Sequence, residues 1–169
     1  MSQLESSLLD RNGAKPDIWS REASATQRLI PFSELASALA KAGNQPVGVE
    51  ITNTVRLPEL EPHFDRLALI AITFPSFSDG RGFSIAKSLR NAGYRGSLRA
   101  VGPLIADQFA YALACGFDEV ELPPHVASRQ PAAIWLAAAR AFRATYQTSH
   151  QTGGKSILEQ RRAARGRLA

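Results

Sequence analysis

The sequence is poor in cysteine, with Cys115 as its one thiol among 169 residues. A single cysteine cannot close a disulfide within the chain or build a cysteine-rich zinc site. The sequence also has no uncharged apolar stretch of about 18 residues, and its first residues lack the basic region and apolar run of a signal peptide. We therefore expect a cytoplasmic protein with no membrane segment.

Length and composition fit one soluble domain with tails. The chain is 44% hydrophobic and 21% charged, which is ordinary for a globular protein. It is long enough to bury a sizeable core without metal or disulfides, and too short for two full-sized α/β domains.

The positive charge is concentrated at the C-terminal end. The formal charge is +5 and the isoelectric point about 9.9. Of this charge, +4 comes from Lys155, Arg161, Arg162, Arg165 and Arg167 against Glu159. Residues 1–150 show no basic helix face with interleaved aromatic residues and no nucleic-acid motif. We expect residues 150–169 to be a flexible basic tail, with docking of this tail on a partner protein or on nucleic acid as lesser alternatives.

Residues 1–28 are expected to be a β-hairpin lead-in. Asn12-Gly13 is a standard hairpin turn, and short apolar pairs flank it on both sides. A two-stranded ribbon is marginal on its own, so we expect it to cap the domain, with Trp19 packing on the core.

Residues 29–149 alternate between strand and helix patterns. Apolar spacing predicts helices over 33–43, 84–92, 104–115 and 131–147, and β-rich runs predict strands over 46–52, 67–74, 97–101 and 118–122. This alternation predicts an α/β fold with a mostly parallel sheet and helices on both faces. A three-layer sandwich is favoured over a partial barrel, and the strand order stays open.

The segment FPSFSDGRGFS, residues 74–84, joins a predicted core strand to a helix, where open α/β sheets often bind ligands. Its candidate anion-binding residues are Ser76, Ser78, Gly80, Arg81, Gly82 and Ser84. Asp79 is a candidate acid or base. The alternative is purely structural: Asp79-Gly80 is a turn, Arg81 pairs with a carboxylate, and Ser84 caps the helix.

The segment RAVGPLIADQ, residues 99–108, repeats this strand-to-helix arrangement. Arg99 and Gln108 are further candidates for anion binding, and Asp107 is a second candidate acid or base. An acidic residue near a helix start also has a structural explanation in the helix dipole. Cys115 is expected to be a small buried side chain, and the three histidines lack the spacing of a metal site.

Four blocks of the sequence resemble a bacterial family catalogued as domain of unknown function 934. The blocks are LALIAITFPSFSDGRGFSIAKSLR, GYRGSLRAVG, DQFAYALACGFDEVEL and AFRATYQ, and the resemblance spans residues 57–147. The residues on the family's motif positions are Ser78, Asp79, Gly80, Arg81, Gly82, Arg99, Asp107, Gln108, Cys115, Gly116, Phe117 and Asp118. No catalytic role is established for them. Pro103 departs from the acidic residue expected there.

Members of the family are described as oxidoreductases involved in sulfite reduction. The resemblance implies an accessory protein of assimilatory sulfate reduction and cysteine biosynthesis, working beside a sulfite reductase that carries siroheme and an iron–sulfur cluster. We expect no cofactor in this chain, because it has neither a nucleotide-binding glycine motif nor several cysteines.

Two functions therefore stay open. The first is an accessory protein that binds sulfite reductase or a sulfur oxyanion through residues 76–84. The second is an enzyme that acts on a sulfur metabolite, with Arg81 and Arg99 holding the anion and Asp79 or Asp107 moving the proton. A minor alternative is nucleic-acid docking through the basic tail.

Overall fold

The computed structural model describes residues 7–22 and 25–141. The chain divides into two units, residues 1–139 and residues 140–169. The predicted basic tail, residues 150–169, lies outside the described residues.

Within the described residues, seven strands form one mixed sheet in the order β2-β1-β7-β6-β5-β4-β3. The strands are β1 (Ser7–Asp10), β2 (Gly13–Lys15), β3 (Leu29–Pro31), β4 (Val47–Thr52), β5 (Leu67–Thr73), β6 (Ser97–Val101) and β7 (Glu119–Leu122). Strands β3 to β7 run parallel, while β1 pairs antiparallel with both β2 and β7. The predicted hairpin is therefore confirmed, and it extends the main sheet.

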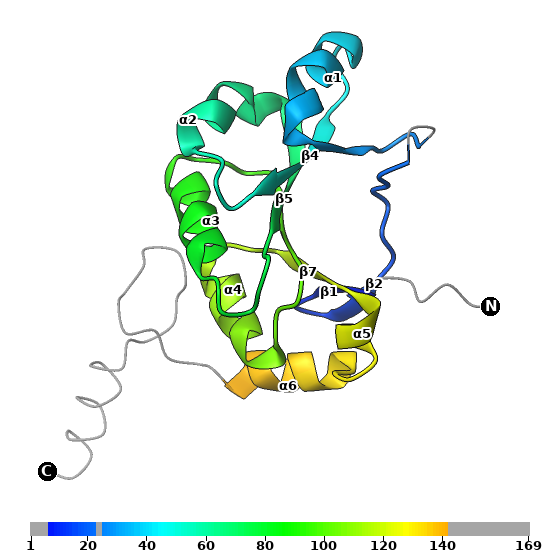
Figure 1. The fold of residues 1–169 in the computed structure, drawn as a ribbon, viewed down its shortest axis with the longest axis vertical. Helices are drawn as coiled ribbons and strands as arrows, with labels where there is room; N and C mark the ends of the chain where they lie inside the picture. Colours follow the sequence, from blue (N-terminus) through cyan, green and yellow to red (C-terminus); the bar gives the residue numbers. More distant parts are fainter. Residues whose placement is uncertain (1–6, 23–24, 142–169) are drawn as a thin grey trace, which may run out of the picture. The chain divides into compact units, whose positions relative to one another are not determined.

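Helices occupy the connections between the parallel strands, and two more follow the last strand (Figure 1). They are η1 (Phe32–Glu34), α1 (Leu35–Lys41), α2 (Leu57–Leu60), η2 (Glu61–Arg66), α3 (Arg81–Asn91), η3 (Ala106–Gln108), α4 (Phe109–Cys115), α5 (Pro124–Ala127) and α6 (Ala132–Ala141). No helix within the described ranges is both long enough and apolar enough to span a bilayer.

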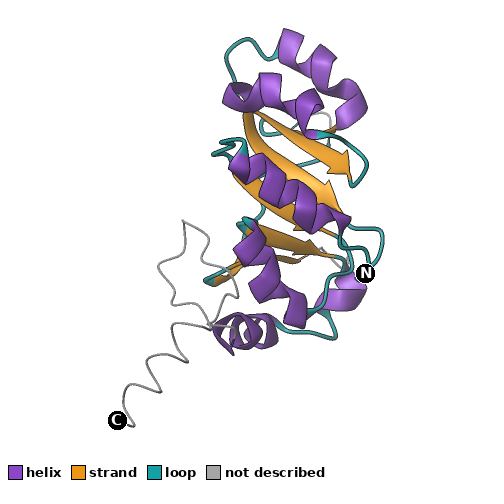
Figure 2. Cartoon of the chain, turned by 90° about the vertical axis from the view of Figure 1, so that its left-hand side faces the viewer, coloured by secondary structure: helices purple, strands orange, loops and turns teal. Residues whose placement is uncertain are grey.

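The α/β class and the mostly parallel sheet are confirmed, but the coverage of the sheet differs from the prediction of helices on both faces. The core side chains of α1 to α6 all belong to one cluster with Val49, Ile70, Leu98 and Val120. Figure 2, viewed from that side, shows helices in front of the strands. Strand order explains this. The order β3-β4-β5-β6-β7 advances in one direction, so successive right-handed crossovers place every connecting helix on the same face.

The opposite face of the sheet, which we call the open face, is partly covered by residues 16–22 and 25–28, which we call the connecting segment. Figure 1 shows this blue segment on the side of the strands away from α3 and α4. Trp19 packs there against Leu29, Leu69 and Ala71, as predicted for a core contact. Gly48 makes room for it, since a Cβ at this position would lie 2.7 Å from Trp19 Cε3.

Candidate functional site

The loop of residues 74–84 is held together by its own polar side chains. The hydroxyl oxygens of Ser76 and Ser78 are 2.9 Å apart, and Ser76 Oγ accepts a hydrogen bond from the Ser78 amide at 3.2 Å. Arg81 donates to Asp79 from Nε at 3.0 Å and from Nη2 at 2.6 Å. The charges and hydroxyls that the sequence offered to an anion are thus largely paired with one another.

The Asp79 carboxyl group is more acidic here than an ordinary aspartate. Hydrogen bonds from the Arg81 side chain and then from the Arg81 amide lower the pKa of Asp79 to about 2, with Asn53 Nδ2 as a further donor at 2.7 Å. A general base works best when its pKa is near the working pH. At neutral pH Asp79 is therefore an ionised acceptor that fixes the loop, and a weak base.

The loop glycines and Ser84 have structural positions. Gly80 stands at the N-cap of α3 without a side-chain cap, so Ser84 does not cap this helix; it lies exposed within α3, and its carbonyl accepts from Ser88 Oγ at 2.9 Å. A Cβ on Gly82 would overlap the ring of Phe74. Gly82 therefore allows α3 to pack closely on the residue that follows β5.

Gln108 joins this loop to the next strand-to-helix connection. Its Nε2 donates to the Phe77 carbonyl at 2.6 Å, and its Oε1 accepts from the Ile105 amide at 3.2 Å. Asp107, the neighbouring candidate, is exposed in the first turn of η3. The structure thus brings Gln108 into contact with the loop of residues 74–84.

Two exposed aromatic residues flank Gln108. Phe77 is 55% exposed and Tyr111 is 54% exposed. Tyr111 lies one helical turn after Gln108, and its ring packs against Phe83 of α3 with centroids 5.0 Å apart. We call Phe77, Gln108 and Tyr111 the aromatic patch.

Arg99 does not join this loop. It lies on β6 with its side chain on the open face, where it is 1% exposed. Its guanidinium donates to both carboxylate oxygens of Asp17 at 2.7 Å, to Glu119 at 2.7 Å and to Glu121 at 3.0 Å. Burial alone would lower the pKa of Arg99, but the hydrogen bonds to Asp17 and Glu119 outweigh it and the pKa is raised. The donors that an anion would need are occupied by carboxylates.

The contacts of Arg99 extend into a larger ion network on the open face. Lys15 Nζ lies 2.8 Å from Glu119, and Arg21 binds Glu121 at 2.8 Å and Glu50 at 2.7 Å. The open-face network consists of Lys15, Asp17, Arg21, Glu50, Arg99, Glu119 and Glu121. Four carboxylates therefore face three cations, which leaves a formal charge of −1.

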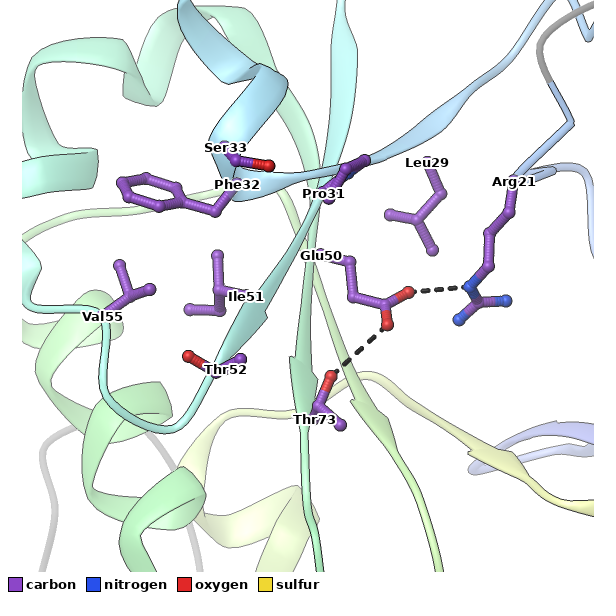
Figure 3. Close-up of a pocket in the computed structure, with 10 residues that line it drawn as sticks. All are labelled: Arg21, Leu29, Pro31, Phe32, Ser33, Glu50, Ile51, Thr52, Val55 and Thr73. Carbon is purple, nitrogen blue, oxygen red and sulfur yellow. Dashed lines mark hydrogen bonds and ion pairs between the residues drawn. The ribbon is translucent and has the colours of Figure 1, made fainter.

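A cavity of about 430 Å³ adjoins one end of this network (Figure 3). Its lining residues are Arg21, Leu29, Pro31, Phe32, Ser33, Glu50, Ile51, Thr52, Val55 and Thr73. Glu50 accepts from Arg21 Nε at 2.7 Å and more weakly from Thr73 Oγ1 at 3.4 Å. The cavity lies where β3, β4 and β5 end, the usual location of ligand sites in parallel sheets. No sequence pattern predicts this cavity. The one local signal is a charged residue, Glu50, inside the otherwise apolar strand VGVEIT.

Other candidate groups offer little chemistry. Cys115 is buried, as predicted, and burial raises the pKa of its thiol, so it is not an activated thiolate. Within residues 7–22 and 25–141, no group of three or more histidine, cysteine or acidic side chains is placed to hold a metal ion.

Comparison with known proteins gives a family and nothing finer. No curated protein and no solved structure matches the chain at a significant level. The model of one family, described as bacterial protein of unknown function (DUF934), matches residues 48–155. This match covers more than half of the chain, including β4 to α6, the loop of residues 74–84 and the aromatic patch. The chain therefore belongs to the DUF934 family of bacterial proteins.

Proposed function

We propose that this protein is an accessory protein of sulfite reduction that acts by binding sulfite reductase through the aromatic patch. The link to sulfite reduction is the one implied by the resemblance to the family. The observation that carries the mode of action is that Phe77 and Tyr111 are each more than half exposed, while Gln108, one helical turn before Tyr111, donates a hydrogen bond to the Phe77 carbonyl. Siroheme and the iron–sulfur cluster would belong to the partner.

The chemistry of this surface supports a protein partner. Aromatic side chains are enriched in protein interfaces and in their energetic hot spots. On most soluble surfaces large apolar side chains are scattered singly, whereas Phe77 and Tyr111 flank the same glutamine. Arg81, in the same loop as Phe77, has a side chain that is 63% exposed. Aromatic and arginine side chains together are typical of the centre of such interfaces.

The loop that carries Phe77 is already ordered by internal contacts. Asn53 and Arg81 both donate hydrogen bonds to the Asp79 carboxylate, and Gln108 donates one to the Phe77 carbonyl. A loop fixed before binding loses little conformational entropy when a partner docks. This arrangement fits a rigid docking surface.

The same contacts favour a protein partner over a small sulfur oxyanion. Arg81 has two of its three nitrogens on Asp79, and Arg99 is enclosed by three carboxylates on the open face. An oxyanion at either arginine would have to compete with a carboxylate already in place. A protein surface can use Arg81 with its pairing to Asp79 intact.

A genetic experiment tests the link to sulfite reduction. The deletion strain is grown on sulfate, sulfite, sulfide or cysteine as the sole sulfur source. We expect failure on sulfate and sulfite with rescue by sulfide, because sulfide is the product of sulfite reduction. Normal growth on all four sources, in a strain with no second copy of the gene, contradicts the proposal.

Complementation tests the aromatic patch. A gene encoding Phe77→Ala and Tyr111→Ala is expected to fail in the deletion strain while its product accumulates normally. The matched control is Ile18→Ala, which removes a side chain that is 65% exposed in the connecting segment. Ile18→Ala should restore growth; restoration by the double variant as well would show that the patch is not used.

A further inference from the structure

The cavity at the ends of β3, β4 and β5 has no part in the function proposed above. Its volume of about 430 Å³ is within the range of pockets that bind small molecules. Much of its wall is apolar, with Leu29, Pro31, Phe32 and Val55 among the lining side chains. In Figure 3, Leu29 and Pro31 lie on the same side of β4 as Glu50, which provides the one carboxylate of the lining, whereas Phe32 and Val55 lie on the other side, next to Ile51. The site thus combines an apolar enclosure with a single anionic group.

Glu50 keeps hydrogen-bonding capacity for a ligand. One of its oxygens accepts from Arg21 at 2.7 Å, while the other has only the Thr73 hydroxyl at 3.4 Å, close to the limit of a hydrogen bond. A carboxylate accepts about four hydrogen bonds. Because the Glu50 side chain is 28% exposed, a donor entering the cavity can reach it.

The charges around Glu50 also favour a positive ligand. Arg21 is the one cation that contacts Glu50 among the described residues, and both of its terminal nitrogens are bound to Glu121. One guanidinium is therefore shared between two carboxylates. The open-face network as a whole carries a formal charge of −1, so an added monocation would balance it.

We propose that this cavity binds a small organic cation, a primary amine with a short apolar chain. The ammonium group would donate to Glu50 and to the threonine hydroxyl beside it. The apolar chain would lie against Leu29 and Pro31, on the same side of β4 as Glu50. A partly desolvated ammonium–carboxylate hydrogen bond is stronger than a neutral one, so Glu50 would set the preference for a cation.

The test uses three probes of equal chain length: butylammonium, butanol and butyrate, compared at constant ionic strength by calorimetry with the full chain. Trp19 gives an independent signal, because its ring covers Gly48, two residues before Glu50 on the same face of β4. Trp19→Phe identifies the part of the fluorescence change that comes from this residue. We expect saturable binding of butylammonium, at least about tenfold tighter than butanol, and none of butyrate.

Three variants separate the cavity from general charge effects. Glu50→Gln should weaken butylammonium binding about tenfold or more. Glu61→Gln removes an exposed carboxylate of η2 outside the cavity and should leave binding unchanged. Pro31→Phe places a larger side chain beside Glu50 while keeping every charge of the network, and should weaken binding as well.

Several results would overturn this inference. They are the absence of saturable amine binding, equal binding of butanol, preferential binding of butyrate, and unchanged binding by a folded Glu50→Gln variant. Preference for butyrate would make Arg21 the anchor and the ligand an anion. Since none of these outcomes involves the aromatic patch, they leave the proposed function to its own tests.

Discussion

Replacing Arg99 with methionine removes the cation at the centre of the open-face network while keeping a side chain of similar length. The change leaves the carboxylates of Glu119 and Glu121 buried on neighbouring positions of β7 and releases Asp17 of the connecting segment. Breaking a buried ion pair on one side costs roughly 3–5 kcal/mol. Lys15 and Arg21 still pair with the two glutamates, so we expect the lower end, about 3 kcal/mol.

The matched control is Arg81→Met. Arg81 also binds an aspartate in two-pronged geometry, but its side chain is 63% exposed. Solvent screens exposed ion pairs, which therefore contribute little to stability, so this variant should lose far less stability than Arg99→Met. Urea denaturation followed by circular dichroism gives both free energies of unfolding, provided that the slopes agree.

The pH dependence of the Arg99→Met effect gives a second test. Burial by itself raises the pKa of Asp17, but hydrogen bonds from Arg99 and the Trp19 amide lower it overall. A carboxylate with a lowered pKa in the folded state stabilises the protein above its unfolded pKa of 3.8, and this contribution is lost as the pH falls through the folded value. The difference between wild type and Arg99→Met should therefore shrink in acid. The reasoning is refuted if both arginine variants lose the same small amount at neutral pH.

Three further predictions concern the loop of residues 74–84 and the packing around it. Gly82→Ala should destabilise the fold by about 1–3 kcal/mol in urea denaturation, because the new methyl group overlaps Phe74, whereas Gly80→Ala, with open space at its Cβ, should change it far less. Arg81→Ala should raise the pKa of Asp79 from about 2 toward the usual aspartate value of 3.8 in an NMR titration, and an unchanged pKa would mean that other donors keep it low. Gly116→Ala should cost about 1 kcal/mol or more, because Gly116 ends α4 at a φ of 107° and its Cβ would meet Arg90.

The elements with strong local patterns were predicted well. The runs at 46–52, 67–74, 97–101 and 118–122 form β4 to β7, with ends shifted by at most one residue. Each is a short run that contains valine, isoleucine or leucine and is bounded by turn residues. The sequence patterns predict no helix between the strands at 46–52 and 67–74, yet residues 57–66 form α2 and η2. Strand β3 has only three residues, too few to produce a periodic signal.

Features that depend on strand order could not be read from local patterns. Helices on both faces require the strand order to reverse, and the observed order does not. The pattern of residues 97–101 correctly predicts that Arg99 lies on a strand. Its burial depends on Asp17, 82 residues earlier in the chain, so no local signal marked it as part of an ion network.

The same contrast between local and long-range contacts applies to the candidate sites. Ser76, Ser78, Asp79 and Arg81 are near one another because they are neighbours in sequence, and the turn and ion-pair alternative for Asp79 and Arg81 matches their contacts. The pocket around Glu50 and Thr73 depends on the register of β4 against β5. That register was not available from the sequence.

The central claim, that the aromatic patch binds sulfite reductase, is tested most directly by measuring the affinity of the purified full chain for purified sulfite reductase of the same bacterium. Wild type and Ile18→Ala should bind with the same affinity. The Phe77→Ala, Tyr111→Ala variant should bind at least about tenfold more weakly, since hot-spot aromatics cost about 2 kcal/mol or more when truncated. Equal binding by all three proteins would contradict the role of the patch, and no binding by wild type would contradict the proposed partner.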